Sequence, residues 1–204
     1  MKTVIVEITT EDLIQLKDAK YNLCFAKKLN DSFNVVWQSY DNFLNTNHFS
    51  YEPNYELFCS NTFEENELVV VSTNIQPCDL GNYCTLTEAG VLDPQTSGGI
   101  NNSLTLKNDY DTIHSGVQQS STGIDGKTIS TPIYVSEKAI IKGYDELNPK
   151  DIVRVWFQQD IETSTMILPP PFQQRLASSY YIDVDLTSTN EVTCVFENGD
   201  WKTS

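Results

Sequence analysis

Basic residues and histidines are scarce in this chain. Thirteen Lys and Arg stand against 28 Asp and Glu in 204 residues, which gives a formal net charge of −15. A surface of this average sign repels the phosphates of nucleic acids and the headgroups of anionic lipids. Only two histidines, His48 and His114, could act as the base of a Ser-His-Asp or Cys-His mechanism. We therefore expect no nucleic acid partner and little support for catalysis.

Long apolar runs are also missing. No stretch approaches the roughly twenty apolar residues of a transmembrane helix, so no membrane span is expected. The first residues, MKTVIVEITTEDL, have a shorter apolar run than a signal peptide needs. The sequence thus favours a cytoplasmic protein, or one secreted without a recognisable signal peptide.

The cysteines do not form a recognisable metal or disulfide framework. Cys24, Cys59, Cys78, Cys84 and Cys194 are odd in number and widely spread, which is typical of reduced thiols. No second Cys or His pair accompanies Cys78 and Cys84 at zinc-finger spacing. A disulfide between these two is sterically allowed across a turn, but we expect all five to be reduced and inert.

Alternation of apolar and polar residues with a period of two is what the sequence does contain. Such alternation predicts strands joined by short turns, and therefore an all-β fold, specifically an antiparallel two-sheet β-sandwich. No linker or repeat divides the chain, so residues 1–204 are expected to form a single domain. The predicted strands are residues 2–8, 21–29, 33–38, 55–63, 67–73, 129–136, 139–142, 180–186 and 192–197.

One short helix near the N-terminus interrupts this pattern. Thr9 stands three residues before Asp12, at capping-box spacing, and Ile8 and Leu13 occupy hydrophobic-staple positions. The sequence predicts a helix that begins after Thr9 and ends by Lys20.

A central hairpin is predicted over residues 151–168, with alternating strands on either side of a turn at residues 159–160. Arg154 is expected to pair with a carboxylate such as Glu162. Pro169, Pro170 and Pro171 follow and cannot donate to a strand ladder, so they end the hairpin.

Residues 74–128 differ in composition, because Gly, Ser, Thr, Asn and Asp dominate them. Only residues 83–86 and 103–107 read as strands within this segment. Long loops in compact domains are often functional, so we expect an ordered, loop-rich cap across one end of the sheets.

The cap contains the best catalytic candidate, His114, beside Ser115 and three residues after Asp111. The alternative hypothesis is therefore an enzyme that acts on a small molecule in a pocket under the 74–128 cap, with His114 as general acid or base. The Gly-x-Ser-x-Gly elbow of hydrolases is absent from the sequence.

No cofactor is expected. Asp109 and Asp111 offer hard oxygen ligands, which makes calcium the weak alternative, but their spacing does not match the twelve-residue calcium loop.

An aromatic and amide-rich stretch, residues 39–55, predicts a binding surface. Polar aromatic loops on a rigid scaffold suit a sugar face or a protein surface. Our first hypothesis is a non-catalytic binding or interaction protein that recognises carbohydrate or another surface, lectin-like or of defence or toxin type, and self-associates into a homo-oligomer. The predicted binding residues are Tyr40, Asn42, Phe43, Asn47, Tyr51 and, in the cap, Tyr110.

Overall fold

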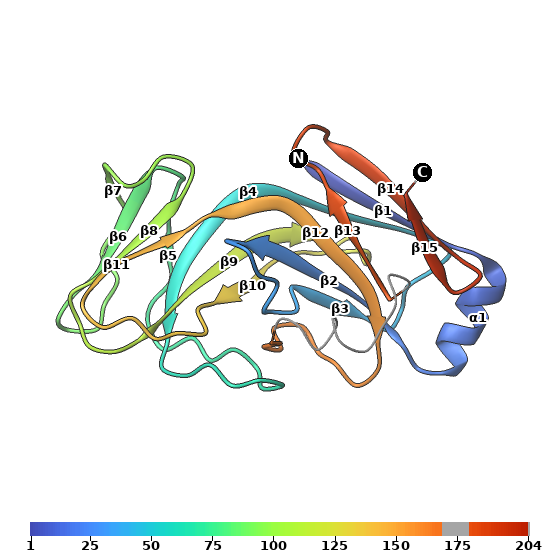
Figure 1. Cartoon of the computed structure of the whole chain (residues 1–204), viewed down its shortest axis with the longest axis horizontal. Helices are drawn as coiled ribbons and strands as arrows, with labels where there is room; N and C mark the ends of the chain where they lie inside the picture. The colour runs from blue at the N-terminus through green and yellow to red at the C-terminus, as the bar shows by residue number, and fades with distance from the viewer. Residues whose placement is uncertain (169–179, 204) are drawn as a thin grey trace.

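Strands dominate the computed structural model, which describes residues 1–168 and 180–203. The described residues form fifteen strands and one helix, arranged in three sheets. The largest sheet arches through the molecule, a small sheet lies at one end and the helix at the other (Figure 1). The all-β expectation is confirmed. The description as two antiparallel sheets is incomplete, because there is a third sheet and two strand pairs are parallel.

The largest sheet has the strand order β10-β9-β4-β1-β14-β15, and β5 pairs with β4 outside this order. β1 and β14 are parallel neighbours, so segments from the two ends of the chain lie side by side. Pairing between β4 and β9 is irregular between Tyr51 and Tyr55. The strands are β1 (Lys2–Ile8), β4 (Thr46–Ser60), β5 (Gln76–Pro77), β9 (His114–Thr122), β10 (Thr128–Val135), β14 (Glu191–Glu197) and β15 (Asp200–Thr203).

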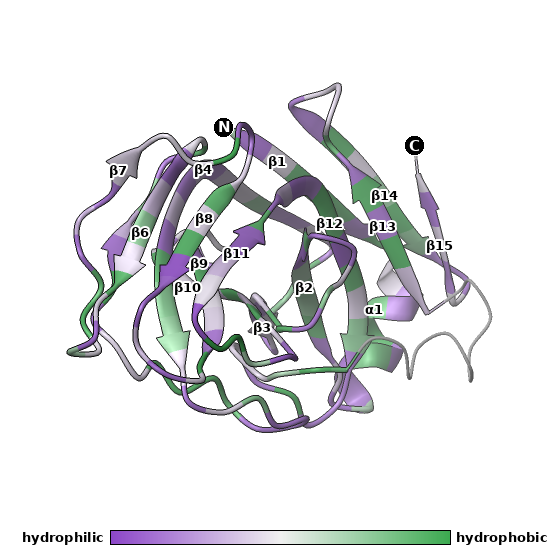
Figure 2. Cartoon of the chain, turned by 60° about the vertical axis from the view of Figure 1, so that its left-hand side comes forward, coloured by the Kyte–Doolittle hydropathy of each residue, from purple (hydrophilic) through white to green (hydrophobic). Residues whose placement is uncertain are grey.

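A second sheet has the order β13-β12-β2-β3 and packs its inner face on the largest sheet. Phe25 of β2 stacks on Phe49 of β4 with ring centroids 4.3 Å apart, and Trp37 meets Phe49 edge-on at 5.0 Å. Figure 2 shows apolar residues along strands of all three sheets. The strands are β2 (Asn22–Leu29), β3 (Gln38–Tyr40), β12 (Pro149–Gln158) and β13 (Tyr181–Asp185).

The third sheet comes largely from the segment expected to be a loop-rich cap. Its order is β11-β8-β6-β7, with β6 (Asn82–Leu86), β7 (Thr96–Ser97), β8 (Leu104–Asn108) and β11 (Gly143–Leu147). The two strands predicted within the cap correspond to β6 and β8. The cap is shorter than expected, because β9 is a central strand of the largest sheet despite its polar sequence. Some of its polar groups find partners there: Gln119 Nε2 donates to Glu52 O and Gln118 Nε2 donates to Glu56 Oε2, both at 2.7 Å.

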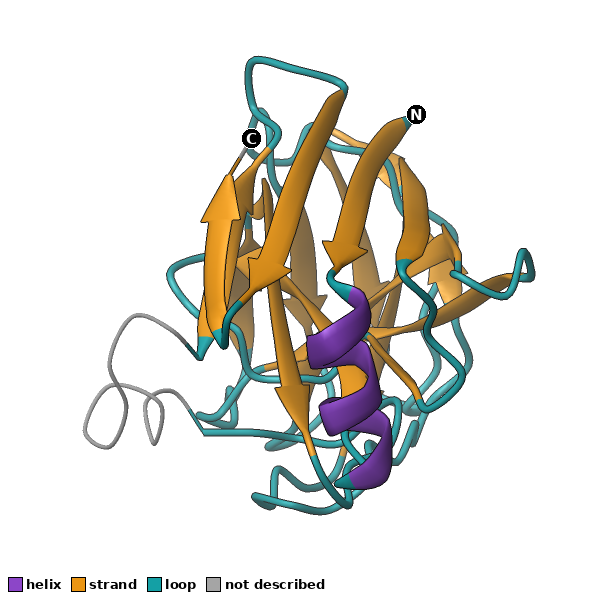
Figure 3. Ribbon diagram, turned by 90° about the vertical axis from the view of Figure 1, so that its right-hand side faces the viewer, coloured by secondary structure: helices purple, strands orange, loops and turns teal. Residues whose placement is uncertain are grey.

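The helix α1 (Thr10–Asp18) begins where the sequence predicts. Thr9 is its N-cap, and the Thr9 hydroxyl accepts a hydrogen bond from Asp12 N at 3.3 Å. Figure 3 shows α1 directly after β1, next to the ends of neighbouring strands. Within residues 1–168 and 180–203, no helix is both long and apolar enough to cross a membrane.

The central hairpin over residues 151–168 is wrong in its second half. β12 forms as expected, but its neighbours are β2 and β13. Residues 161–168 make only isolated bridges, Val35 with Met166 and Leu68 with Thr165. Positive φ angles at Asp160 (51°) and Ser164 (69°) turn the chain away from a ladder. The proline run at residues 169–171 lies outside the described residues.

Arg154 pairs with a carboxylate, as expected, although the partner is not Glu162. Arg154 Nε and Nη2 donate to the two carboxylate oxygens of Asp183 at 2.7 and 2.8 Å. The two residues are cross-strand partners in β12 and β13, which places their side chains on the same face.

Candidate functional site

A cleft of about 370 Å³ lies between α1 and the hairpin formed by β14 and β15. We call it the α1 cleft. Four aromatic side chains, Tyr21, Phe157, Tyr180 and Phe196, contribute to its lining, together with two polar residues of α1, Asp12 and Gln15. The walls therefore come from segments that are far apart in the sequence.

Stacked rings hold the aromatic wall of the α1 cleft in place. Phe157 stacks on Trp201 with centroids 5.3 Å apart and planes inclined by 12°. Phe196 meets both rings at 4.9 Å, and Phe43 meets Phe157 at 5.5 Å. Ring pairs of this kind add to the stabilisation from area burial alone. The Phe157 and Phe196 part of the wall is thus a packed cluster, held by Phe43 and Trp201.

Asp12 fixes the position of the helix against the hairpin. Its carboxylate accepts hydrogen bonds from Asn198 N (2.9 Å) and Gly199 N (3.1 Å). Asn198 and Gly199 have φ of 54° and 78°, as the two central residues of a type I′ hairpin turn require. Asp12 is therefore mainly structural, and Gln15, Tyr21 and Tyr180 are further lining residues that carry a polar group.

A second cluster of polar groups lies between the largest sheet and the β13-β12-β2-β3 sheet and surrounds Lys27. The Lys27 side chain has no exposed surface, and its Nζ lies 3.1 Å from Asp151 Oδ1. The same Nζ lies 3.8 Å from the centroid of the Tyr51 ring, a cation–π contact. The Tyr51 hydroxyl donates to Asp151 Oδ1 at 3.4 Å, and Lys2 Nζ lies 4.0 Å from Asp151 Oδ2.

Burial changes the proton affinities in this Lys27 cluster. Desolvation lowers the pKa of Lys27 to about 8, although attraction to Asp151 acts in the opposite direction. Desolvation, reinforced by the Asp151 carboxylate, raises the pKa of Tyr51 and that of Tyr55. Lys27 is completely covered, so the cluster acts as an internal ion pair and not as a ligand site in this conformation.

The predicted binding residues do not form one surface. Phe43 and Tyr51 belong to the core, and Asn47 is also buried. The remaining three residues divide between distant places: Tyr40 is half-buried on β3, Asn42 is exposed after it, and Tyr110 is exposed after β8 in the third sheet.

Asn47 has a structural role that its burial explains. Its side chain accepts from Leu44 N at 2.8 Å, donates to Leu44 O at 2.7 Å and reaches Val6 O at 3.3 Å. These bonds fasten the loop before β4, so the amide is not available to a ligand.

The predicted catalytic residues are close in sequence, but each makes its hydrogen bond to a different partner and not to another member of the set. His114 Nδ1 lies 2.6 Å from Ser136 O, so this nitrogen carries the proton and donates. The buried Ser115 hydroxyl donates to a carboxylate oxygen of Asp145. Adjacent residues of a strand point to opposite faces, which separates His114 from the Ser115 hydroxyl. Asp111 is exposed, and its Oδ1 accepts from Thr112 N at 2.7 Å.

The carboxylates of the two residues considered for calcium also accept hydrogen bonds from residues nearby in the sequence. Asp109 Oδ2 accepts from Lys107 Nζ at 2.7 Å, and Asp111 bonds Thr112 as described. In the part of the chain that the structure describes, no group of three or more His, Cys, Asp or Glu side chains could hold a metal ion.

The residues of the α1 cleft were missed in the sequence because no local pattern joins them. Tyr21 follows the helix, Phe157 is near the end of β12, and Phe196 is near the end of β14. Each looks like an ordinary strand or loop aromatic on its own. The only signal was the helix cap at Thr9, which predicts a helix that must pack against the rest of the fold.

Comparisons of the chain with models of known protein families, with curated proteins and with solved structures give no match.

Proposed function

We propose that this chain is a non-catalytic binding protein that holds a neutral sugar in the α1 cleft. The observation that carries the proposal is the aromatic wall of Tyr21, Phe157, Tyr180 and Phe196 beside the polar side chain of Gln15. The faces of aromatic rings are electronegative, so they attract the C–H groups on the flat face of a pyranose. Amide and hydroxyl groups at the rim then suit the sugar hydroxyls.

Size and charge narrow the ligand class. A cleft of about 370 Å³ is at the lower end of small-molecule sites, which suits one or two sugar rings. A net charge of −15 and the Asp12 carboxylate in the lining disfavour acidic sugars. A neutral mono- or disaccharide unit is therefore the expected ligand.

The scaffold that we propose for this site is a β-sandwich, with the largest sheet and the β13-β12-β2-β3 sheet as its two layers. The stacking of Phe25 on Phe49 supports this arrangement, since the two rings come from opposite layers. The third sheet is an extension at the end far from α1.

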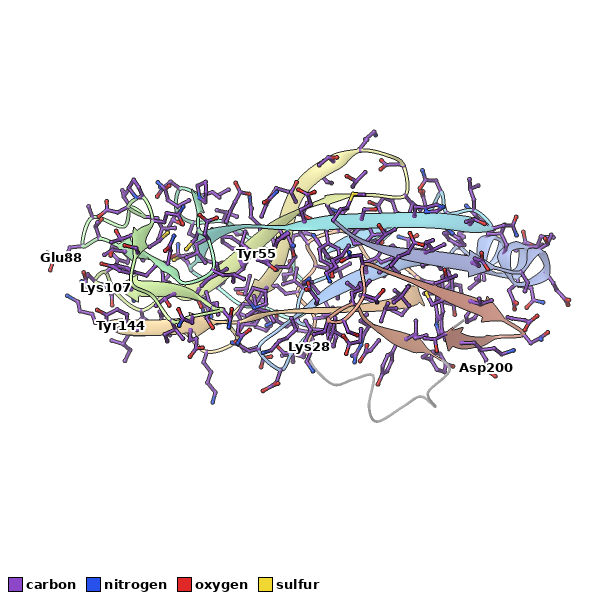
Figure 4. The ribbon with its side chains drawn as sticks, turned by 90° about the horizontal axis from the view of Figure 1, so that it is seen from above. Lys28, Tyr55, Glu88, Lys107, Tyr144 and Asp200 are labelled. Carbon is purple, nitrogen blue, oxygen red and sulfur yellow. The ribbon has the colours of Figure 1, made fainter. Side chains whose placement is uncertain are left out.

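A glycan array followed by titration calorimetry with the sugars that bind tests the proposal. Tyr21→Ala and Gln15→Ala should each weaken binding by about tenfold, the usual effect of removing one well-placed contact. Tyr144→Ala is the matched control, because Tyr144 is 70% exposed and lies at the opposite end of the molecule from Asp200 of the β14–β15 hairpin (Figure 4). An array without any neutral glycan bound, or unchanged binding by Tyr21→Ala, would overturn the proposal.

Self-association is a separate part of the proposal. A homo-oligomer presents several α1 clefts at once and would bind a multivalent glycan surface more tightly than a free sugar. Size-exclusion chromatography with light scattering measures the oligomeric state. A monomer would restrict the proposed function to single-site binding.

A further inference from the structure

Cys78 and Cys84 lie against each other where the largest sheet meets the third sheet. Cys78 directly follows β5, and Cys84 is the third residue of β6. A turn joins them, closed by a hydrogen bond from Asn82 N to Asp79 O at 3.1 Å. Cys84 Sγ lies 4.0 Å from Pro77 O, and the thiols of Cys78 and Cys84 are hydrogen-bonded to each other.

This hydrogen bond makes the two thiols chemically unequal. It lowers the pKa of the Cys84 thiol, while the same bond together with burial raises the pKa of Cys78. A lower pKa increases the thiolate fraction, and the thiolate is the nucleophile in thiol chemistry. Cys84 is therefore the attacking residue of the pair and Cys78 the one that follows.

Both cysteines are buried, but the chain on either side of Cys78 is exposed. Cys78 is 1% exposed and Cys84 is 0% exposed, but Pro77 and Asp79 on either side of Cys78 are exposed. β5 has two residues and pairs only with β4. Opening so short an edge costs much less than global unfolding, and it uncovers the Cys78 side of the pair.

We propose that Cys78 and Cys84 are a modification site that forms a reversible disulfide with a low-molecular-weight disulfide as oxidant. The Cys84 thiolate attacks one sulfur of the oxidant and expels one thiolate, which leaves a mixed disulfide on Cys84. Cys78 then loses its proton and attacks the Cys84 sulfur, and the second thiolate leaves. Two protein thiols are oxidised by two electrons, their two protons pass to the two expelled thiolates, and the oxidant disulfide is thereby reduced to two thiols.

Cys59 is the competing partner, because it lies close enough to Cys84 for the two thiols to interact electrostatically. Its place in the chain argues against it. Cys59 is completely buried in β4, which pairs with both β5 and β9 near this residue. It becomes accessible only when a central strand opens, whereas Cys78 lies on the short edge.

The test uses the full chain, folded, in buffers of increasing ratio of oxidised to reduced glutathione, quenched in acid. Titration of the denatured samples should show five free thiols falling to three, with a loss of two hydrogen atoms by mass. Cleavage at Asp and Glu separates the three cysteines, because Glu64 lies between Cys59 and Cys78 and Asp79 between Cys78 and Cys84. The Cys78 and Cys84 fragments should remain joined until a reductant is added.

Two variants make the result specific. Cys59→Ser should still lose two thiols, and Cys78→Ser should keep all four of its remaining thiols free of intramolecular bonds. Cys84→Ala replaces Cys78→Ser if the latter does not fold. Five free thiols in fully oxidising buffer, or a link that includes Cys59, would overturn the proposal.

Discussion

Lys27 shows how a residue's surroundings decide its chemistry. The sequence places it between Ala26 and Lys28 in an alternating strand, where a lysine is ordinarily solvated. The fold instead covers it completely and gives it Asp151 and the Tyr51 ring as neighbours. A buried ammonium is costly, and its pair with a carboxylate only partly offsets that cost.

The Lys27 cluster predicts a pH dependence of stability. The pKa of Lys27 falls from 10.5 in the unfolded chain to about 8 in the folded one. Between these two pH values the unfolded state binds more protons than the folded state. The free energy of unfolding therefore increases as the pH rises from about 8 to 10.5, by on the order of 2 kcal/mol. Urea titrations of wild type and Lys27→Met at pH 7 and pH 10 measure it.

The comparison with Lys27→Met is needed because other buried groups titrate in the same range. Burial raises the pKa of Cys24, of Cys59 and of Cys194 to about 12, which makes stability fall as pH rises above the thiol's usual value. Both proteins share these thiols, so the difference between their unfolding free energies isolates Lys27. A difference that is the same at both pH values would contradict the prediction.

At the residue scale, the sequence predicts where strands form better than it predicts which of their side chains are buried. The aromatic residues of the stretch 39–55 were predicted as a binding surface, yet Phe43, Phe49 and Tyr51 form part of the core. In an aromatic strand the period-two pattern does not distinguish a ring that faces the core from one that faces a ligand. Burial of these three rings depends on β2 and β12, which the local sequence does not contain.

At the scale of elements, the contact between α1 and the β14–β15 hairpin depends on one carboxylate. Asp12 accepts two backbone N–H groups of the hairpin turn and lies at the third helical position after the Thr9 cap. It joins two elements that are almost the whole chain apart. The contact therefore holds together two of the walls of the α1 cleft.

We predict that Asp12→Ala lowers the free energy of unfolding by about 2 kcal/mol, because it leaves two N–H groups without their acceptor and weakens the helix start. Glu11→Ala is the control, since Glu11 is exposed in the same turn of α1. Guanidinium titration followed by tryptophan fluorescence measures both variants. Equal stability of Asp12→Ala and Glu11→Ala would show that the junction does not depend on the carboxylate.

A second prediction concerns the contact between β12 and β13. The Arg154 guanidinium lies 4.2 Å from the Phe33 ring centroid and 3.9 Å from that of Tyr181 while it binds Asp183 through two nitrogens. Lysine can reproduce neither the planar fork nor the stacking, so Arg154→Lys should lower the unfolding free energy by about 1 kcal/mol.

The size of this effect is modest because Asp183 is partly solvated, with 38% of its side chain exposed. A double-mutant cycle with Asp183→Asn separates the ion pair from the ring contacts. Additive losses from the two substitutions would mean that stacking, and not the ion pair, holds Arg154 in place.

The predicted hairpin over residues 151–168 failed because alternation identifies a strand but not its partner. β12 was correct, and the residues after it alternate as well, so pairing the two was the simplest interpretation. Asp160 and Ser164 adopt positive φ, which is uncommon in residues other than glycine and which alternation does not reveal. The helix was predicted better, because its signal, the Thr9 cap, is entirely local.

At the scale of the whole molecule, the arrangement of the sheets was the part that could not be predicted. Parallel pairing of β1 with β14 joins residues near the two ends of the chain, and parallel pairing of β6 with β8 begins a third sheet. Parallel neighbours need long crossovers and leave no turn signature in the sequence. The all-β class followed from short-range alternation, whereas the topology depends on contacts that composition does not encode.

Net charge is the whole-molecule property that the sequence does determine, and it leads to the last prediction. A charge of −15 on a folded chain produces self-repulsion that unfolding relieves. Raising the ionic strength from about 0.01 M to about 0.15 M shortens the Debye length from about 30 Å to about 8 Å, so it should raise the Tm by several degrees at pH 7. The effect should shrink at pH 5, since the net charge approaches zero at the sequence pI of about 4.3. Thermal unfolding followed by circular dichroism at both pH values measures it, and an equal salt effect at the two would mean that local ion pairs, and not the overall charge, dominate the electrostatics of this fold.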